Sequence, residues 1–441
     1  MSFIADKQTT DDLNLLGKYT PGSVYDTFNK VKTRGGERLL EEMFRHPLSD
    51  PGAINDRSWV FSYLTTRPVH LPVTGEQLGV IEDYLASDGA GHLLATVTNV
   101  LRWRLMAVVV KDESYGIICE NVRATCEVLA ICRSFFQHYE TPNAPALLQE
   151  KVTTARRILA DPRLALQPAD VGDLPWLKLA RLHHLLLHVL RSPLLQLCSI
   201  LHELDVYFAV GRVAAERHFS FAHALPEGEY VLHAQDMRHP CLERGVGNPV
   251  EMNRHRNILF LTGANMAGKS TFMKAFGINL YLAHMGFPVA AKDMVFSVKE
   301  GIYSSINVSD SIGQGYSHFY AEVRRVKTVA EAVAGSGSLL VIFDELFKGT
   351  NVKDAYDATL AVTAAFARYR NCWFIISTHI IEVGEALRER YDNLQFVYLP
   401  TEMQGGSPRY TYRLTEGITS DRHGMIIIEQ EGILDIINGQ S

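Results

Sequence analysis

One short segment constrains this chain more than any other. Residues 263–270 read Gly-Ala-Asn-Met-Ala-Gly-Lys-Ser and directly follow the apolar run 258–261. This is the pattern GxxxxGK[ST], in which glycines let backbone amides curve around phosphate oxygens. In such a loop Lys269 reaches the outer phosphates, Ser270 ligates Mg²⁺, and the following helix adds the positive end of its dipole. The expected phosphate-binding residues are Gly263, Ala264, Asn265, Met266, Ala267, Gly268, Lys269, Ser270 and Thr271.

Two further apolar runs end in polar residues suited to the same site. Residues 339–343 lead into Asp344 and Glu345, and residues 373–377 lead into Thr378 and His379. Ligands of open α/β sheets bind at the carboxyl ends of parallel strands. We therefore expect Asp344 to hold Mg²⁺ together with Ser270, Glu345 to polarise the attacking water, and His379 to sense the γ-phosphate.

The two halves of the chain differ in their hydrophobic periodicity. Up to about residue 225 apolar residues recur at spacings of three and four, which predicts helices. From about residue 228 short β-rich runs alternate with helical patterns, which is typical of an α/β domain with a mainly parallel sheet. With 441 residues, the chain predicts two domains: an α-helical lever domain over 1–225 and an α/β P-loop NTPase domain over 226–441.

The pattern also places individual elements. We expect strands at 230–233, 257–262, 339–343, 373–377 and 394–399. We expect helices at 35–44, 176–190, 194–217, 269–284, 318–334, 352–368 and 380–390, with the second and third separated at Ser192-Pro193.

Composition excludes several classes of protein. The 43 Lys and Arg against 49 Asp and Glu leave a net charge of -6, so a nucleic acid would have to bind a local basic patch. The six cysteines show no CxxC pair, and no apolar run reaches the roughly 20 residues that span a bilayer. We expect a cytoplasmic protein without disulfides or a membrane partner. His184 and His188 have HxxxH spacing, but no third ligand follows, so we expect no zinc site there.

Several segments together resemble the ATPase domain of the MutS family of DNA mismatch-repair proteins. The loop TGANMAGKST is accompanied, in the family's order, by Arg238-His239-Pro240, by DSIGQGYSHF at 310–319, by DELFKGTN at 344–351 and by Ser377-Thr378-His379. Residues 25–48 and 201–206 resemble, more loosely, the start of the family's lever and the helix that returns from it.

The resemblance implies an ABC-ATPase-like domain with C-terminal dimerisation helices, ATP and Mg²⁺ as cofactors, and a homodimer that binds DNA. It also implies composite sites, in which Ser317 and Gly315 of one subunit approach the γ-phosphate held by Lys269 of the other. Tyr412 stands where the family usually has a histidine beside the adenine, and its ring can stack on the base.

The sequence also departs from the family pattern. Core-like sequence begins near Tyr25, so we expect a truncated MutS-like protein that lacks the N-terminal mismatch-recognition and connector domains, with the DNA clamp reduced or absent. Two functions stay open. The first is an ATP-switched DNA-binding protein of repair or recombination, and the second is a regulatory or scaffolding ATPase dimer that holds a protein partner in place of DNA. The expected DNA contacts are Arg102, Trp103, Arg104, Lys151, Arg156 and Arg157.

Overall fold

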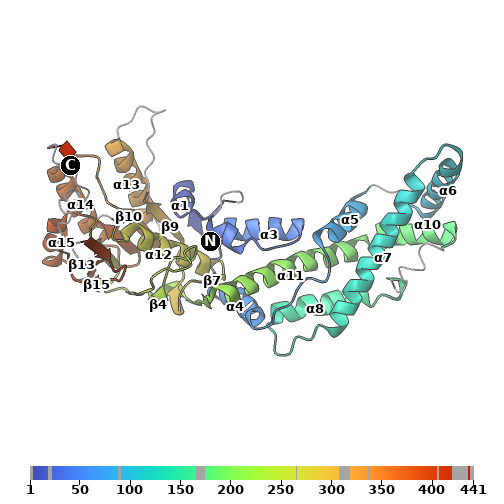
Figure 1. Ribbon diagram of the computed structural model, residues 1–441, viewed down its shortest axis with the longest axis horizontal. Coiled ribbons are helices and arrows are strands. Elements are labelled where there is room, and N and C mark those ends of the chain that lie inside the picture. Colours follow the sequence, from blue (N-terminus) through green and yellow to red (C-terminus); the bar gives the residue numbers. More distant parts are fainter. Residues whose placement is uncertain are drawn as a thin grey trace. The chain divides into compact units, whose positions relative to one another are not determined.

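The chain divides into two compact units in the computed structural model (Figure 1). The sheet unit consists of Met1–Thr27, Phe44–Ser58 and Glu216–Ser441, and the helical unit consists of Phe28–Met43 and Trp59–Ala215. The units do not follow the predicted boundary at 225, because two early segments pack with the sheet. The structure describes residues 3–17, 22–87, 91–164, 174–264, 266–306, 318–335, 337–404, 407–419 and 436–437.

A seven-stranded sheet forms the centre of the sheet unit, in the order β1-β9-β10-β11-β6-β12-β15. All neighbouring strands are parallel except β12 and β15. The central strands β6, β10 and β11 are buried almost throughout, which explains why they read as continuous apolar runs. The strands are β1 (Ile4–Ala5), β6 (Ile258–Thr262), β9 (Gly301–Ser305), β10 (Leu339–Asp344), β11 (Trp373–Ser377), β12 (Leu394–Tyr398) and β15 (Thr415–Glu416).

Helices cover both faces of this sheet. Val341 and Phe343 of β10 lie in a core shared with α13, α14 and α15. On the other face, Ile342 packs against α12, where a Cβ added to Gly277 would lie 2.9 Å from its Cδ1. Successive side chains of a strand point to opposite faces of the sheet, so β10 contacts one helical layer on each face. The helices are α12 (Lys269–His284), α13 (His318–Gly335), α14 (Val352–Phe366) and α15 (Ile381–Arg388).

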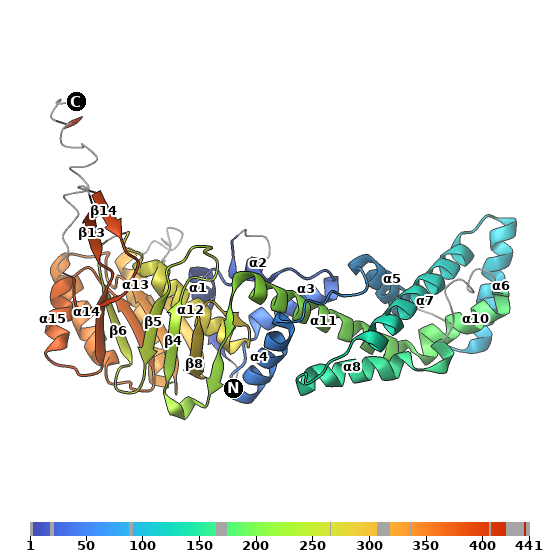
Figure 2. The ribbon, with the colours of Figure 1, turned by 60° about the horizontal axis from the view of Figure 1, so that its bottom comes forward.

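The described residues of this unit also form three smaller sheets, and Figure 2 shows β4, β5 and β8 beside the central sheet. Strands β3, β8, β4 and β5 form one sheet, β2 pairs with β7, and β13 pairs with β14. The elements are β2 (Ser220–Phe221), β3 (His223–Leu225), the 3-10 turn η3 (Glu227–Glu229), β4 (Leu232–Met237), β5 (Asn248–Met252), β7 (Pro288–Val289), β8 (Asp293–Ser297), β13 (Thr401–Gln404) and β14 (Ser407–Tyr410).

The N-terminal segment is part of the central sheet. Strand β1 pairs with β9, and α1 (Lys7–Asp12) follows it. The buried carboxylate of Asp12 accepts hydrogen bonds from Ser304 Oγ at 2.7 Å and Ile306 N at 2.9 Å. Arg325 of α13 donates to Asp6 and to the carbonyl of Ser304. The first residues therefore hold the end of β9 and one turn of α13.

The helical unit is organised around α11. Asp205 of α11, which is 4% exposed, accepts hydrogen bonds from Lys32 N, Thr33 N and Thr33 Oγ1, each at 2.8 Å. The division between the units cuts through α2, α3, α4 and α11. The elements are α2 (Val24–Phe28), α3 (Arg34–Arg45), α4 (Pro51–Thr65), α5 (Gly75–Ala86), α6 (Leu93–Val109), α7 (Ser114–His138), α8 (Ala146–Leu159), the 3-10 turn η1 (Pro162–Leu164), α10 (Trp176–His184), the π-helical turn η2 (Leu185–Val189) and α11 (Arg191–Arg217).

Most of the expected elements are present within two residues of their predicted ends. Three differ. The expected helix at 176–190 is α-helical only to His184 and continues as the π-helical turn η2 over Leu185–Val189. The expected strand at 230 begins at Leu232, because Tyr230 has φ +52° and ends the turn η3. Helix α11 begins at Arg191 rather than after Pro193, because a proline in the first turn removes no N–H that the helix would use.

Helix α11 alone among the described helices is long and apolar enough to cross a membrane by length and composition, but 78% of its apolar window is buried in the protein. This is the pattern of a core helix. All six cysteines are free thiols. Among the described residues, no group of three or more His, Cys, Asp or Glu is placed to hold a metal ion.

Lys299 is the most deeply buried cation among the described residues of the sheet unit, at 1% exposure. Its Nζ donates to Ser338 Oγ at 2.8 Å and to the carbonyl of Asn371 at 2.9 Å, and it lies 3.8 Å from the centre of the Trp373 ring. Burial lowers the pKa of Lys299 to about 7. The ammonium is therefore held near its titration point at neutral pH.

We predict that Lys299 makes the free energy of unfolding rise with pH in the alkaline range. Below about pH 7 the lysine is charged in both states, and folding bears the cost of burying that charge. Between about pH 7 and the ordinary value of 10.5 the folded protein holds it neutral while the unfolded chain still binds the proton, so stability rises with pH across this window.

The measurement is urea unfolding of the wild type and Lys299→Met between pH 7 and 10. The difference in unfolding free energy should change by up to about 1.4 kcal/mol per pH unit in favour of the wild type. Lys353→Met, at an exposed position of α14, is the control and should follow the wild type. Parallel curves for wild type and Lys299→Met would contradict the assignment.

Candidate functional site

The predicted phosphate loop lies between β6 and α12. Gly263 and Gly268 have φ values of +143° and +99°, and Met266 has φ +68°. Glycine is required at 268 for a second reason, since a Cβ there would lie 2.9 Å from the ring of Tyr412. The loop therefore has the left-handed backbone that turns successive amides inward, and α12 begins immediately after it at Lys269.

The ammonium of Lys269 lies inside the curve of this loop. Its side chain is 5% exposed, and Nζ donates to the carbonyls of Gly263 at 2.9 Å and Ala264 at 3.2 Å. Nζ also lies 3.6 Å from Oε1 of Glu345. A positive charge is thus fixed where a bound phosphate would place its negative oxygens.

Asp344 joins three elements at the carboxyl edge of the sheet. Ser270 Oγ, from the first turn of α12, donates to Oδ2, and Ser377 Oγ, at the end of β11, donates to Oδ1 at 2.5 Å. A carboxylate and a hydroxyl that converge in this way are oxygen ligands of the kind Mg²⁺ prefers. The chemistry of Ser270 and Asp344 therefore fits the metal that the sequence predicts.

Glu345 follows Asp344 in a strained backbone conformation, with φ +56°. The imidazole of His379 lies 3.8 Å from the Glu345 carboxylate. His379 and the charge of Lys269 lower the pKa of Glu345 to about 2, against the opposing effect of burial. The carboxylate is ionised at neutral pH, which is the form a general base requires.

A pocket of about 280 Å³ opens beside the loop. Tyr412 forms one wall, and Asn248 fixes that segment by donating to Tyr412 O at 3.0 Å and accepting from Leu414 N at 2.7 Å. Burial lowers the pKa of His239 to about 4, so this lining ring is neutral at pH 7. An aromatic wall and a largely apolar lining suit a planar base.

The structure brings together most of the predicted site residues. Lys269, Ser270, Asp344, Glu345 and His379 meet at one edge, and Thr271 and Tyr412 line the adjacent pocket. Ala264 and Ala267 lie in the loop, and the Met266 side chain is 75% exposed. Asn265, Gly315 and Ser317 lie outside the described residues.

Sequence reasoning did not assign several residues of this region. The sequence predicts Ser377 only as the last residue of a strand, yet its hydroxyl is a direct partner of Asp344. Its position at the end of an apolar strand was the available signal. Arg238, His239 and Arg244 line the pocket, but no spacing rule connects them to the loop.

Two of the expected DNA contacts are used inside the helical unit. Lys151 forms an ion pair with Glu203. Arg156 donates to the carbonyls of Phe136 at 2.9 Å and Tyr139 at 2.8 Å, at the end of α7. Cations at such carbonyls stabilise a helix end. Arg102, Arg104 and Arg157 are exposed, and Trp103 is half-buried.

Comparison with known proteins finds matches to one family of proteins. The family model for MutS domain V matches residues 259–438. The DNA mismatch repair protein MutS of Bacillus licheniformis is 29% identical over 241 residues, which are 53% of this chain and 27% of the relative. The protein of the same name from Pseudothermotoga lettingae is 28% identical over 264 residues, 56% of this chain and 32% of the relative.

These alignments span about a third or less of the relatives' own length. The domain model covers the segments that carry Lys269, Asp344 and His379. On this evidence residues 259–438 match MutS domain V, and the chain is similar to MutS proteins over about half of its length.

Proposed function

We propose that this protein is a Mg²⁺-dependent ATPase that uses ATP binding and hydrolysis as a switch. The observation that carries the proposal is the meeting of Lys269, Asp344 and Glu345 at the ends of neighbouring elements, with Ser270 and His379 beside them. A buried ammonium, an ionised carboxylate and a hydroxyl–carboxylate pair are the groups that phosphoryl transfer to water requires.

The residues of the site have distinct parts in the proposed reaction. Lys269 neutralises the charge that develops on the transferred phosphoryl group. Glu345 accepts the proton of the attacking water, and His379 orients Glu345 and senses the γ-phosphate. Ser270 and Asp344 would hold Mg²⁺, which would supply positive charge to stabilise the triphosphate.

The proposed switch is a homodimer with composite sites. The described site is open on one side, since the His379 side chain is 57% exposed and Met266 is 75% exposed. We place Ser317 and Gly315 of the partner subunit there, as the family resemblance implies. A hydroxyl and a glycine amide from a second subunit would complete the charge stabilisation only when ATP is present.

The proposed setting is DNA repair or recombination in the cytoplasm, supported by relatives named DNA mismatch repair proteins. DNA would contact the exposed Arg102, Arg104 and Arg157 of the helical unit. One observation favours a second function, in which the helical unit binds a protein. Lys151 and Arg156 have internal partners, while α6 exposes large apolar side chains to solvent.

We predict that Lys269→Ala abolishes ATP binding, because the loop loses the cation that offsets the triphosphate charge. Equilibrium dialysis with labelled ATP should show at least a hundredfold loss of affinity. Lys353→Ala, at an exposed position of α14, is the matched control and should bind as the wild type does. Unchanged affinity in Lys269→Ala would refute the assignment of the phosphate loop.

We predict that Glu345→Gln binds ATP but hydrolyses it about 10²- to 10⁴-fold more slowly, since a general base contributes that much. Light scattering should then show a dimer that accumulates with ATP. Glu382→Gln, exposed in the first turn of α15, is the control. Normal turnover would assign the base to another group, and a monomer at every ATP concentration would reject the composite site.

We predict that DNA binding, measured by fluorescence anisotropy, weakens steeply with salt. Arg157→Glu should lower affinity and reduce the slope of log K against log salt by about one. Arg388→Glu on α15, in the sheet unit, should change neither. Absence of binding to duplex, branched and single-stranded DNA at low salt would reject the DNA function and leave the protein-partner function.

A further inference from the structure

Helix α6 has two apolar faces, of which one packs inside the helical unit. Thr96 and Val100 are 3% and 0% exposed on the inner face, which lies against α7 and α10. Leu94, Leu105 and Val108 are 82%, 59% and 82% exposed on the outer face. A soluble helix normally buries one stripe and presents polar side chains elsewhere. The outer face of α6 does the opposite.

The outer residues follow the spacing of a helix–helix seam. Leu94, Thr98, Leu101, Leu105 and Val108 are separated by four, three, four and three residues. This is the heptad spacing that keeps one stripe facing a second helix. Thr98 is the single polar member, and both its hydrogen bonds go to carbonyls of its own helix. We call these five residues the outer seam.

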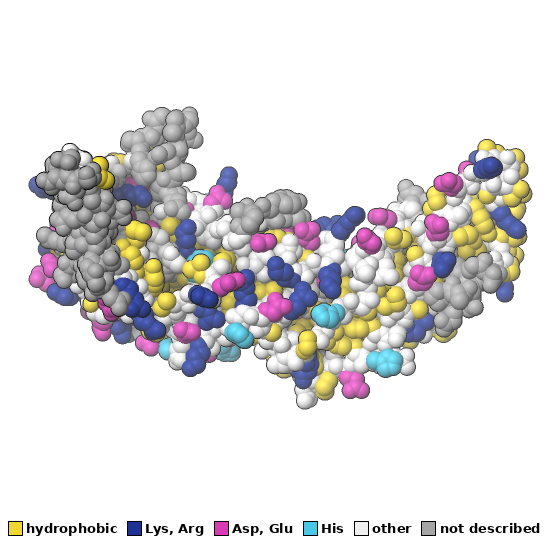
Figure 3. Space-filling view, viewed as in Figure 1, with side chains coloured by type: hydrophobic (Ala, Val, Ile, Leu, Met, Phe, Trp, Pro, Cys, Tyr) yellow, Lys and Arg dark blue, Asp and Glu magenta, His cyan; other side chains and the backbone are white. Residues whose placement is uncertain are grey.

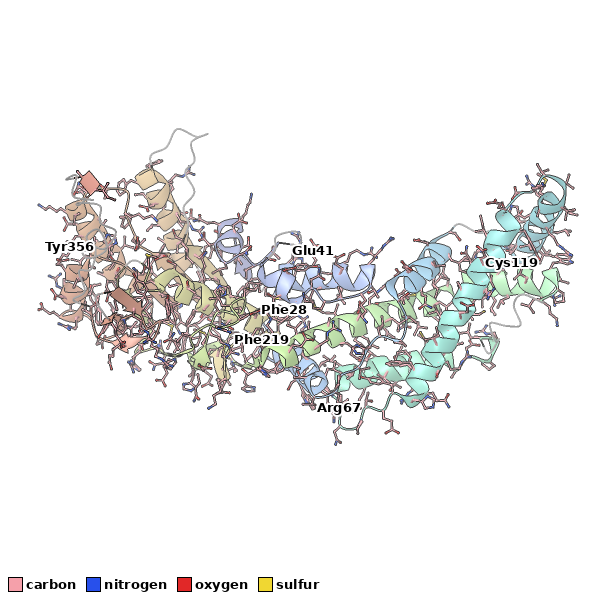
Figure 4. The ribbon with its side chains drawn as sticks, in the orientation of Figure 1. Phe28, Glu41, Arg67, Cys119, Phe219 and Tyr356 are labelled. Atoms are coloured by element: carbon pink, nitrogen blue, oxygen red, sulfur yellow. The ribbon has the colours of Figure 1, made fainter. Side chains whose placement is uncertain are left out.

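Apolar exposure continues through the last residue of α6 and beyond it. Val109, which ends the helix, is 77% exposed, and Val110 and Ile117, which follow it, are 62% and 53% exposed. Figure 3 shows hydrophobic side chains gathered at this end of the helical unit, and in Figure 4 Cys119 marks the part of α7 that lies beside α6. Contiguous exposed apolar surface of this kind indicates an interaction site.

The charges on α6 itself have one sign. Arg102 and Arg104 flank the outer seam, and α6 contains no Asp or Glu. Lys111 follows the end of α6 together with the acids Asp112 and Glu113. Hydrogen bonds from Ser114, and to a smaller extent the charge of Arg102, lower the pKa of Asp112. In helix pairs, charges flanking the seam select the partner. A partner with acidic flanking positions would therefore be preferred over one with basic positions.

We propose that the outer seam docks an amphipathic helix of a partner protein, with apolar residues at heptad spacing and acidic residues beside them. The inference deepens the second function proposed above, since it names the surface and the chemistry of the partner. The seam does not involve the nucleotide site. ATP hydrolysis and docking can therefore fail separately.

The test uses the full chain and a labelled synthetic peptide of three heptads, with Leu at the seam positions and Glu at the flanking positions. A second peptide carries Lys in place of Glu. Fluorescence anisotropy should show that the acidic peptide binds at least tenfold more tightly than the basic one, and that salt weakens this preference.

Leu105→Glu should weaken binding of the acidic peptide at least tenfold. Leu105 is largely exposed, so the variant should fold, and far-UV circular dichroism checks this. Val80→Glu, at a position of α5 that is 41% exposed, is the matched control and should bind normally. ATP turnover, measured on the same samples, should be equal in all three proteins, and lost turnover would concern the nucleotide site alone.

Four outcomes would overturn the inference. They are no binding of the acidic peptide, equal binding of both peptides, self-association of the chain that Leu105→Glu abolishes, and sedimentation with phosphatidylglycerol vesicles that Leu105→Glu abolishes. The third would assign the seam to a second copy of this chain, and the fourth to a lipid surface.

Discussion

The carboxylate of Asp344 holds the candidate site together. It accepts hydrogen bonds from hydroxyls on two other elements, Ser270 and Ser377, so the phosphate loop and β11 are tied to the end of β10. The tie depends on register, because Asp344 is paired with Ser377, and Ser377 with Leu261 of β6. A slip of one residue would exchange the positions of Asp344 and Glu345. The roles of the two acids therefore rest on the packing of the buried strands as much as on their own chemistry.

Local patterns predicted the parts of the fold that local forces determine. Helix α12 and strand β11 have the ends that the sequence indicates, because glycine, lysine and continuous apolar runs mark them. Strand β1 has two residues and pairs with a segment about three hundred residues away. Its neighbouring sequence therefore contains no pattern that predicts it. The pocket residues Arg238 and Arg244 reach the site through β4 and the turn after it, which only tertiary packing can arrange.

Side chains of the same type have different surroundings in the helical unit. From sequence, Arg156 and Arg157 look alike, yet one caps the end of α7 and the other faces solvent. The same holds for apolar residues of α6, since a sequence rich in Leu and Val reads as core on every face. In the structure Val100 is buried and Val108 is exposed. Solvent exposure therefore distinguishes the apolar side chains of α6 that pack in the core from those that are available to a partner.

Pairing of Ile4 with Gly301 also has a consequence for how the protein is made. On a ribosome that adds about 5 to 20 residues per second, the first strand waits roughly 15 to 60 s for its neighbour to be synthesised. During that interval Asp6 and Asp12 lack Arg325 and Ser304, the groups they bond in the finished protein. The central sheet can therefore be completed only late in translation, after most of the helical unit has left the exit tunnel.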